Sequence, residues 1–169
     1  MRKYLILLPL LAACHPAPPA EPPEKVVEAL YGDQFVAPIA GVPDSARLAK
    51  LRPYLSDSLA ALLAAADARR AADIARAPNE KPSWAEGNIF VSLFEGQDAF
   101  YLQPAIEDRA GYKVPIRSQY KARGETSGTT WADTAVVTAQ RGKWVVDDVI
   151  YGGSWEFARK GRLRGALQP

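Results

Sequence analysis

The sequence predicts an α+β domain in which helices come first and a curved antiparallel sheet of three to four strands wraps onto them in a cone-like shape. Apolar residues recur at helical spacing from Glu24 to Pro78, whereas apolar and polar residues alternate from Phe100 to Tyr151. Helices segregated from antiparallel strands in this way are typical of the α+β class. The chain has 169 residues, of which 48% are apolar, and this favours one domain with a single core.

The first two helical stretches are predicted from Glu24 onward. The first runs to near Phe35 and carries its apolar residues on one face. The second begins at Ser45, which serves as its N-cap, and continues toward Leu55. Pro53 either divides this stretch or lies in the turn before the next helix.

The third helix has the clearest pattern. Ser56 or Asp57 can cap it, and apolar residues follow at helical spacing from Leu59 to Ile74, before Pro78. The arginines near its end suit a helix C-terminus and indicate a solvated face rather than an anion site.

The second half has the period of antiparallel strands. Tyr112–Tyr120 alternates an apolar face with a polar one, and residues from Phe100 to Ile106 suggest the strand before it. Thr130–Arg141 and Lys143–Tyr151 form a hairpin around Arg141-Gly142. Gly152-Gly153 closes the sheet, and a short tail helix from Leu163 to Leu167 packs back onto it.

The N-terminus has the layout of a secretory signal, which we assign to residues 1–13. Arg2 and Lys3 precede a short apolar run that is too short to span a bilayer. Leu11-Ala12-Ala13-Cys14 resembles the lipobox of bacterial lipoproteins, which implies acyl chains on Cys14 and a membrane partner through them. The alternative is an ordinary signal peptide followed by a buried cysteine. His15, in place of Asp, favours the outer membrane over the inner and a periplasm-facing domain.

Residues 14–24 are expected to form the lipidated cysteine and a proline-rich tether, and residues 25–169 a single domain. At about 3.1 Å per residue, this spacer would hold the domain roughly 30 Å from the lipid surface. Loss of Arg2 and Lys3 with the signal lowers the 21 basic residues by two, to equal the 19 acidic ones. No basic stripe remains to indicate a nucleic-acid partner.

Composition excludes several classes of site. The chain has one Cys and one His, and both lie outside the predicted domain. An internal disulfide framework, a cysteine metal cluster, a His-ligated zinc and a Ser-His-Asp triad are therefore excluded. No cofactor, metal or catalytic residue is predicted, and Ser92 and Ser118 have no partner for activation.

Three acidic positions are candidate site residues. Glu86 and Glu95 flank an apolar segment, where a desolvated carboxylate would act as an acid or base, although exposed ends of a short buried helix or loop are the favoured interpretation. Asp147 and Asp148 point to opposite faces of one strand, so they do not form a dyad. Asp148 is placed on the apolar face, where Arg117, Lys121 or a backbone N–H would partner it in a structural ion pair or a ligand site.

The aromatic candidates are Trp84, Tyr120 and Trp155, because aromatic side chains are enriched where proteins bind. Trp155 lies in a glycine-rich exit loop, where an exposed aromatic would mean contact with a partner. Core packing is expected for Trp144.

Two segments resemble a bacterial lipoprotein branch of the nuclear-transport-factor-two-like superfamily, a domain of unknown function. They are Trp84–Gly96 and Lys143–Gly153. The resemblance implies a conical cavity between sheet and helix, and dimers formed through the open sheet face. Enzymes of the wider superfamily use His, Asp and Tyr in the cone, and this chain lacks the matching motif.

The sequence therefore predicts a lipid-anchored envelope protein whose domain binds a partner protein, in an accessory or immunity-type role, or a small apolar ligand. The alternative is an isomerase- or hydratase-type enzyme using Asp148, Glu86 or a tyrosine hydroxyl. A third interpretation is a structural envelope factor that spaces other proteins. Loss of function in Asp148→Asn would favour the enzyme, and loss on truncation of Trp155 would favour the binding protein.

Overall fold

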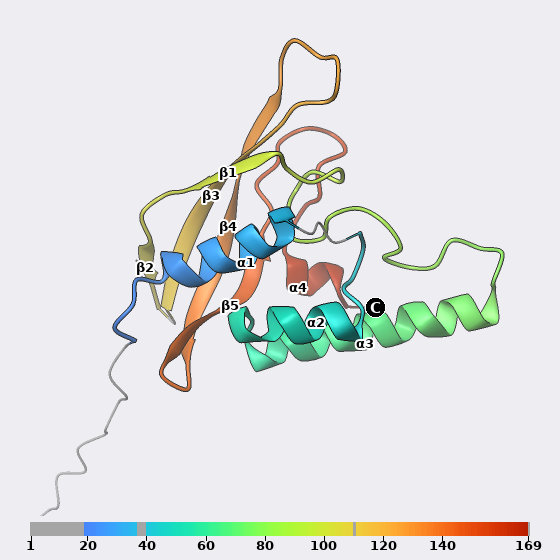
Figure 1. Ribbon diagram of the computed structural model, residues 1–169, viewed down its shortest axis with the longest axis horizontal. Coiled ribbons are helices and arrows are strands. Elements are labelled where there is room, and N and C mark those ends of the chain that lie inside the picture. The colour runs from blue at the N-terminus through green and yellow to red at the C-terminus, as the bar shows by residue number, and fades with distance from the viewer. Residues whose placement is uncertain (1–18, 37–39, 110, 169) are drawn as a thin grey trace, which may run out of the picture.

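The computed structural model describes residues 19–36, 40–109 and 111–168, and its elements follow the predicted order of helices and then strands (Figure 1). The α+β prediction is confirmed, and the described sheet has five strands because the segment near Phe100 divides into two short ones. The elements are α1 (Glu24–Val36), α2 (Ser45–Leu51), a 3₁₀ turn η1 (Arg52–Tyr54), α3 (Asp57–Arg76), β1 (Ala99–Leu102), β2 (Ile106–Asp108), β3 (Gly111–Tyr120), β4 (Thr129–Gln140), β5 (Lys143–Ile150) and α4 (Leu163–Ala166). The signal, Cys14 and the first part of the tether lie outside the described residues.

The sheet is antiparallel with the order β1-β3-β4-β5, and β2 also pairs with β3. Arg141 and Gly142 join β4 to β5 with φ angles of 52° and 73°, as a two-residue hairpin turn with two left-handed residues requires. The outer edge of β5 is not left open, because single bridges join it to Leu55 and Arg162. The predicted hairpin around Arg141-Gly142 is thus confirmed.

The helix starts follow local capping chemistry. Asp44, rather than Ser45, caps α2, because its Oδ1 accepts a hydrogen bond of 2.7 Å from the Arg47 amide. Ser56 caps α3 by accepting from the Leu59 amide at 3.0 Å. Pro53 ends the regular helix and lies in η1, between α2 and α3.

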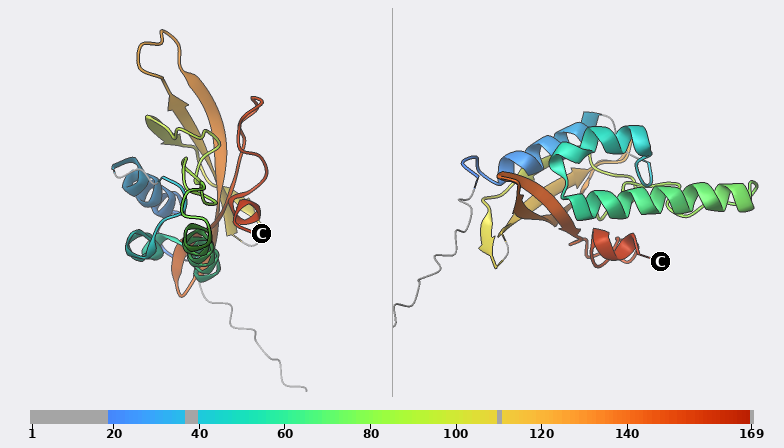
Figure 2. Two further views of the ribbon diagram at one scale, coloured as in Figure 1. Left: turned by 90° about the vertical axis from the view of Figure 1, so that its right-hand side faces the viewer. Right: turned by 90° about the horizontal axis from the view of Figure 1, so that it is seen from below.

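The core lies between the sheet and the helices. α1 packs across β1 and β5 and covers one face of the sheet, while α3 and α4 lie beyond the β5 edge (Figure 2). Leu30 and Tyr31 of α1 are fully buried, as are Val114 and Ile116 of β3, which confirms the alternating face predicted for that strand. The interior of the expected cone is therefore filled by side chains.

A β-bulge in β5 overturns the predicted face of Asp148. Val137 pairs with Val146, but Val136 pairs with Asp148, so Asp147 is an extra residue without an opposite partner. Because Val137 and Val146 face the core, Asp148 faces the other side of the sheet. Asp148 therefore does not share a face with Val146, as strict alternation had predicted.

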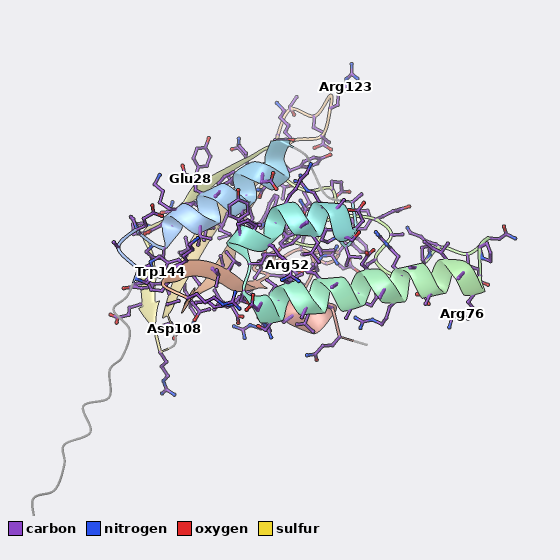
Figure 3. The ribbon with its side chains drawn as sticks, turned by 60° about the horizontal axis from the view of Figure 1, so that its bottom comes forward. Glu28, Arg52, Arg76, Asp108, Arg123 and Trp144 are labelled. Atoms are coloured by element: carbon purple, nitrogen blue, oxygen red, sulfur yellow. The ribbon has the colours of Figure 1, made fainter. Side chains whose placement is uncertain are left out.

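The second half of α3 projects from the body of the domain, and Arg76 marks its tip (Figure 3). In the described part of the chain, the structure contains no helix that is both long enough and apolar enough to span a membrane.

Candidate binding groove

A surface groove of about 350 Å³ lies between two segments that are far apart in sequence. One wall is the irregular segment 81–94 after α3, and the other is the loop between β5 and α4. We call it the 84/157 groove. Its lining residues are Lys81, Pro82, Trp84, Ala85, Glu86, Ile89, Ser92, Phe94, Phe157 and Arg159.

Trp84 is fixed in place at the start of the first wall. Its backbone has a φ of 51°, a left-handed conformation that a bulky residue adopts only under constraint from its surroundings. The indole N–H donates to the Ala166 carbonyl at 2.9 Å, and the Arg69 guanidinium lies 5.0 Å from the ring centroid. These contacts hold the half-buried ring between α3 and α4.

A buried carboxylate joins the two walls. Asp133 of β4 is completely buried, and its Oδ2 accepts from the Ser92 amide at 2.9 Å and from the Trp131 indole at 2.8 Å. Its Oδ1 accepts from the Gly152 amide at 2.9 Å and from the Ser92 hydroxyl. Four donors thus surround one carboxylate, as a buried charge requires.

Ser92 completes this cluster from the groove side. Its hydroxyl donates to Asp133 and accepts from the amides of Gly152 and Gly153, at 3.1 and 3.0 Å. A Cβ on Gly153 would lie 2.9 Å or less from atoms of Ser92, Trp155 and Ala158, so only glycine fits there. The bonds of Ser92 to Asp133 and to two backbone amides give it a structural role in joining the walls.

Two buried tyrosines flank the cluster. Tyr31 donates to the Phe90 carbonyl at 2.8 Å, and Tyr151 donates to the Ile89 carbonyl at 2.6 Å. Burial, together with the nearby negative charge of Asp133, raises the pKa of both phenols above the ordinary value of 10.0. Both side chains therefore remain neutral donors that fix the segment after Asn88.

The groove rim is apolar and carries a net positive charge. Phe157 is 86% exposed and Phe94 is 48% exposed. Lys81 and Glu86 form a 2.6 Å ion pair on the rim, with both side chains more than half exposed. Arg159 forms no ion pair with any described residue, and its Nε is buried without a hydrogen-bond partner. Its guanidinium carbon lies 6.0 Å from the Tyr151 ring centroid.

Of the predicted site residues, Trp84 and Glu86 line the groove together. Glu86 has Lys81 as its partner, so the favoured interpretation as an exposed carboxylate agrees with its geometry. Glu95 is exposed and is not among the lining residues. Tyr120 lies in a separate depression of about 230 Å³ beside the β3–β4 loop.

Trp155 and Asp148 are both held by internal contacts. Trp155 is half-buried and packs edge-on against Trp131 with centroids 5.7 Å apart, so Phe157 is the exposed aromatic of this loop. Asp148 is buried and accepts from the Arg164 amide at 3.0 Å. Of the three expected partners, the backbone N–H is therefore the one present, and the ion-pair partner is Arg162 at 3.3 Å in place of Arg117 or Lys121.

Asp147 is part of the same C-terminal cluster as Asp148. Its Oδ1 accepts from the hydroxyls of Ser56 and Ser58, at 2.6 and 3.1 Å, and from the guanidinium of Arg164 at 3.0 Å. These bonds tie the start of α3 to β5 and α4. Both aspartates thus bond to Arg164, Asp148 through the backbone amide and Asp147 through the guanidinium.

The functional candidates that the sequence interpretation missed are Asp133, Phe157 and Arg159. Asp133 had a detectable signal, because alternation in β4 places it on the same face as Trp131, Ala135 and Val137. Phe157 and Arg159 have no such sequence signal, since they lie within the loop between β5 and α4, where side chains follow no periodic pattern. Among the described residues, no group of three or more potential ligands is arranged to hold a metal ion.

Comparison with known proteins adds one relative. The chain is similar to a protein of Escherichia coli (strain K12) named "Uncharacterized lipoprotein YbjP". The two are 32% identical over 120 residues, which is 70% of this chain and 63% of the relative, so the match spans less than two thirds of that protein. The similarity supports a bacterial lipoprotein of the cell envelope. No family model and no solved structure matches the chain.

Proposed function

We propose that the protein is anchored to a membrane of the cell envelope by acyl chains on Cys14, with its domain in the periplasm and the outer membrane favoured. The signal layout, the lipobox-like Leu11–Cys14 and the similarity to an uncharacterized lipoprotein support this proposal. Several acyl chains together give stable anchoring, whereas one gives marginal binding.

The domain binds a partner protein through the 84/157 groove, and Phe157 is the observation that carries this proposal. A side chain that is 86% exposed cannot enclose a small ligand, but it can insert into an apolar pocket of another protein. Phe94 continues the apolar surface, and the Asp133 cluster holds both walls rigid before binding.

The charge of the groove defines what the partner presents. Arg159 provides a guanidinium without an ion-pair partner among the described residues, and it lines the same groove as Phe157. A guanidinium binds carboxylates through two parallel hydrogen bonds. The complementary surface has an apolar pocket next to an aspartate, a glutamate or a C-terminal carboxylate.

We also propose that the domain has the nuclear-transport-factor-two-like fold. The helix α1 packed on one face of an antiparallel sheet agrees with it, although Tyr31 and Phe90 fill the interior where that superfamily has its cavity. Binding is therefore assigned to the surface groove in preference to an internal small-ligand site. The carboxylates named for the enzymatic alternative, Asp148 and Glu86, are both engaged in ion pairs.

Site-specific photo-crosslinking in the source cells tests this function. A benzophenone amino acid replaces Phe157 in the full-length protein, and the matched control places it at Tyr101, which is 58% exposed on β1. We expect a discrete protein adduct from position 157 that is absent from position 101 and is lost when Arg159→Gln is added. Equal adducts from both positions, or an adduct that ignores Arg159→Gln, would refute groove binding.

A further inference from the structure

The beginning of the described chain is bound to the domain. The Trp144 indole donates to the Glu21 carbonyl at 2.7 Å, and Glu24 accepts from the Ala105 amide at 2.7 Å. Residues 19–22 also line a depression of about 470 Å³ together with Trp144 and Tyr54. The first bond that fixes the described chain to this end of the domain is therefore at Glu21.

Only His15–Ala20 separate this fixed point from the cysteine that we propose to be lipidated. At roughly 3.3–3.6 Å per residue, the chain from Cys14 to Glu21 reaches at most about 25 Å. The β3–β4 ladder from Tyr112 to Tyr120 is itself about 27 Å long, at about 3.4 Å per residue. The domain is therefore longer than its own tether.

We propose that one end of the domain, formed by the β4–β5 turn, β2 and the start of α1, rests on the lipid surface. Figure 3 shows Trp144 and Asp108 at this end, where the described chain begins, and Arg123 and Arg76 at distant corners. A tether this short keeps Trp144 near the bilayer, and the ladder carries Arg123 away from it. This inference rests on the proposed lipid anchor at Cys14.

The side chains at this end suit a lipid interface. Ile106 of β2 is 59% exposed, and Trp144 is half-buried with its ring edge-on to Tyr112. Lys143 is exposed beside them, where a long basic side chain reaches anionic headgroups, and Lys25 is also exposed but pairs with Glu28 at 2.7 Å. An apolar residue, a tryptophan and lysines at one end match the chemistry of the boundary between headgroups and acyl chains.

This orientation places the 84/157 groove toward the periplasm. Asp133, which joins the groove walls, pairs with Ile116 at the midpoint of the β3–β4 ladder, four residues or about 14 Å from Tyr112. Figure 1 shows the loop between β5 and α4 at the opposite side of the sheet from the start of α1. A partner protein can therefore reach Phe157 without meeting the bilayer.

Fluorescence quenching by labelled lipids tests the orientation. Lys143→Cys and Arg123→Cys are made in the full-length lipoprotein, in which acylation blocks the native thiol, and each new cysteine carries an environment-sensitive dye. The proteins are reconstituted into phosphatidylethanolamine–phosphatidylglycerol vesicles that contain a headgroup-linked quencher. We expect loss of most fluorescence at position 143 and little loss at position 123. Asp108→Cys and Arg76→Cys form a second pair with the same expectation.

Flotation of the same vesicles separates the two possible failures. Protein that floats and is quenched equally at both positions, or more strongly at position 123, overturns the orientation and leaves the anchor intact. Protein that does not float overturns the anchor and the orientation together. The lipid-free Cys14→Ser form supplies the quenching expected without a tether.

Discussion

Replacement of Asp133 by asparagine should destabilise the domain by about 3 kcal/mol, as estimated from its hydrogen bonds. The carboxylate has two acceptor oxygens that receive four bonds, whereas an asparagine amide has one acceptor oxygen. If that oxygen keeps the Ser92 amide and the Trp131 indole, the new NH₂ group faces the Gly152 amide, donor against donor.

The size of the effect follows from those bonds. A hydrogen bond to a charged group contributes about 1.5–3 kcal/mol, and two such bonds are lost. The Ser92 hydroxyl can turn to accept from the new NH₂, and the Gly152 amide keeps its 3.1 Å bond to that hydroxyl. The asparagine also avoids the cost of burying a charged carboxylate, and this offsets a further part of the loss. The remaining destabilisation is roughly 3 kcal/mol, which lowers Tm by about 6–12 °C for a domain of this size.

Urea unfolding of the lipid-free Cys14→Ser form, followed by circular dichroism, measures this difference. Glu86→Gln is the matched control, because it neutralises an exposed carboxylate and should change stability by less than about 1 kcal/mol. An Asp133→Asn protein within about 0.5 kcal/mol of its parent would refute the reasoning. It would mean that desolvation of the carboxylate costs as much as its four hydrogen bonds contribute.

Three further predictions concern the buried tyrosines, the contact of Trp144 with the start of the described chain, and the two aromatic residues of the β5–α4 loop. The pKa values of Tyr31 and Tyr151 are higher in the folded protein than in the unfolded chain. As the pH rises above about 10, the unfolded chain therefore loses these protons first. The free energy of unfolding should then fall by up to roughly 1.4 kcal/mol per pH unit for each phenol. Unfolding curves from pH 9 to 11.5 should show a shallower slope in Tyr151→Phe. Trp144→Phe removes the bond to the Glu21 carbonyl and should increase hydrogen exchange at the Lys25 amide, which donates to the Pro22 carbonyl at 3.1 Å, at a cost of about 1 kcal/mol. Trp155→Ala should cost about 2–3 kcal/mol in thermal unfolding, since it packs on Trp131, whereas Phe157→Ala should stay within about 0.5 kcal/mol; the opposite ranking would contradict the packing.

The sequence predicted the elements well where local chemistry decides them. The hairpin turn at Arg141-Gly142, the Ser56 cap and the alternation in β3 depend on a few neighbouring residues, and each matches its prediction. The N-cap of α2 was wrong by one residue because Asp44 and Ser45 are both good caps, and only the bond from Asp44 to Arg47 distinguishes them.

The site was harder to predict because it depends on contacts between distant segments. A single bulge at Asp147 placed Asp148 on the face of the sheet opposite to the predicted one, and no residue type in β5 predicts a bulge. Phe157 and Trp155 are separated by two positions in one loop, yet one is exposed and the other packs on Trp131. Loop side chains have no period, so their exposure follows only from the folded contacts.

The Asp133 cluster connects the buried core to the proposed binding surface. A buried carboxylate contributes little net stability compared with a well-packed apolar core, so its value lies in what its bonds position. Here the four bonds link β4 to Ser92 on one wall of the groove and to Gly152 on the loop that forms the other. Neither wall belongs to a helix or strand, and loops alone would fluctuate. A rigid groove with Phe157 at its rim loses less conformational entropy on binding than flexible loops would. This is the physical reason for fixing both irregular walls to the buried Asp133 carboxylate of β4.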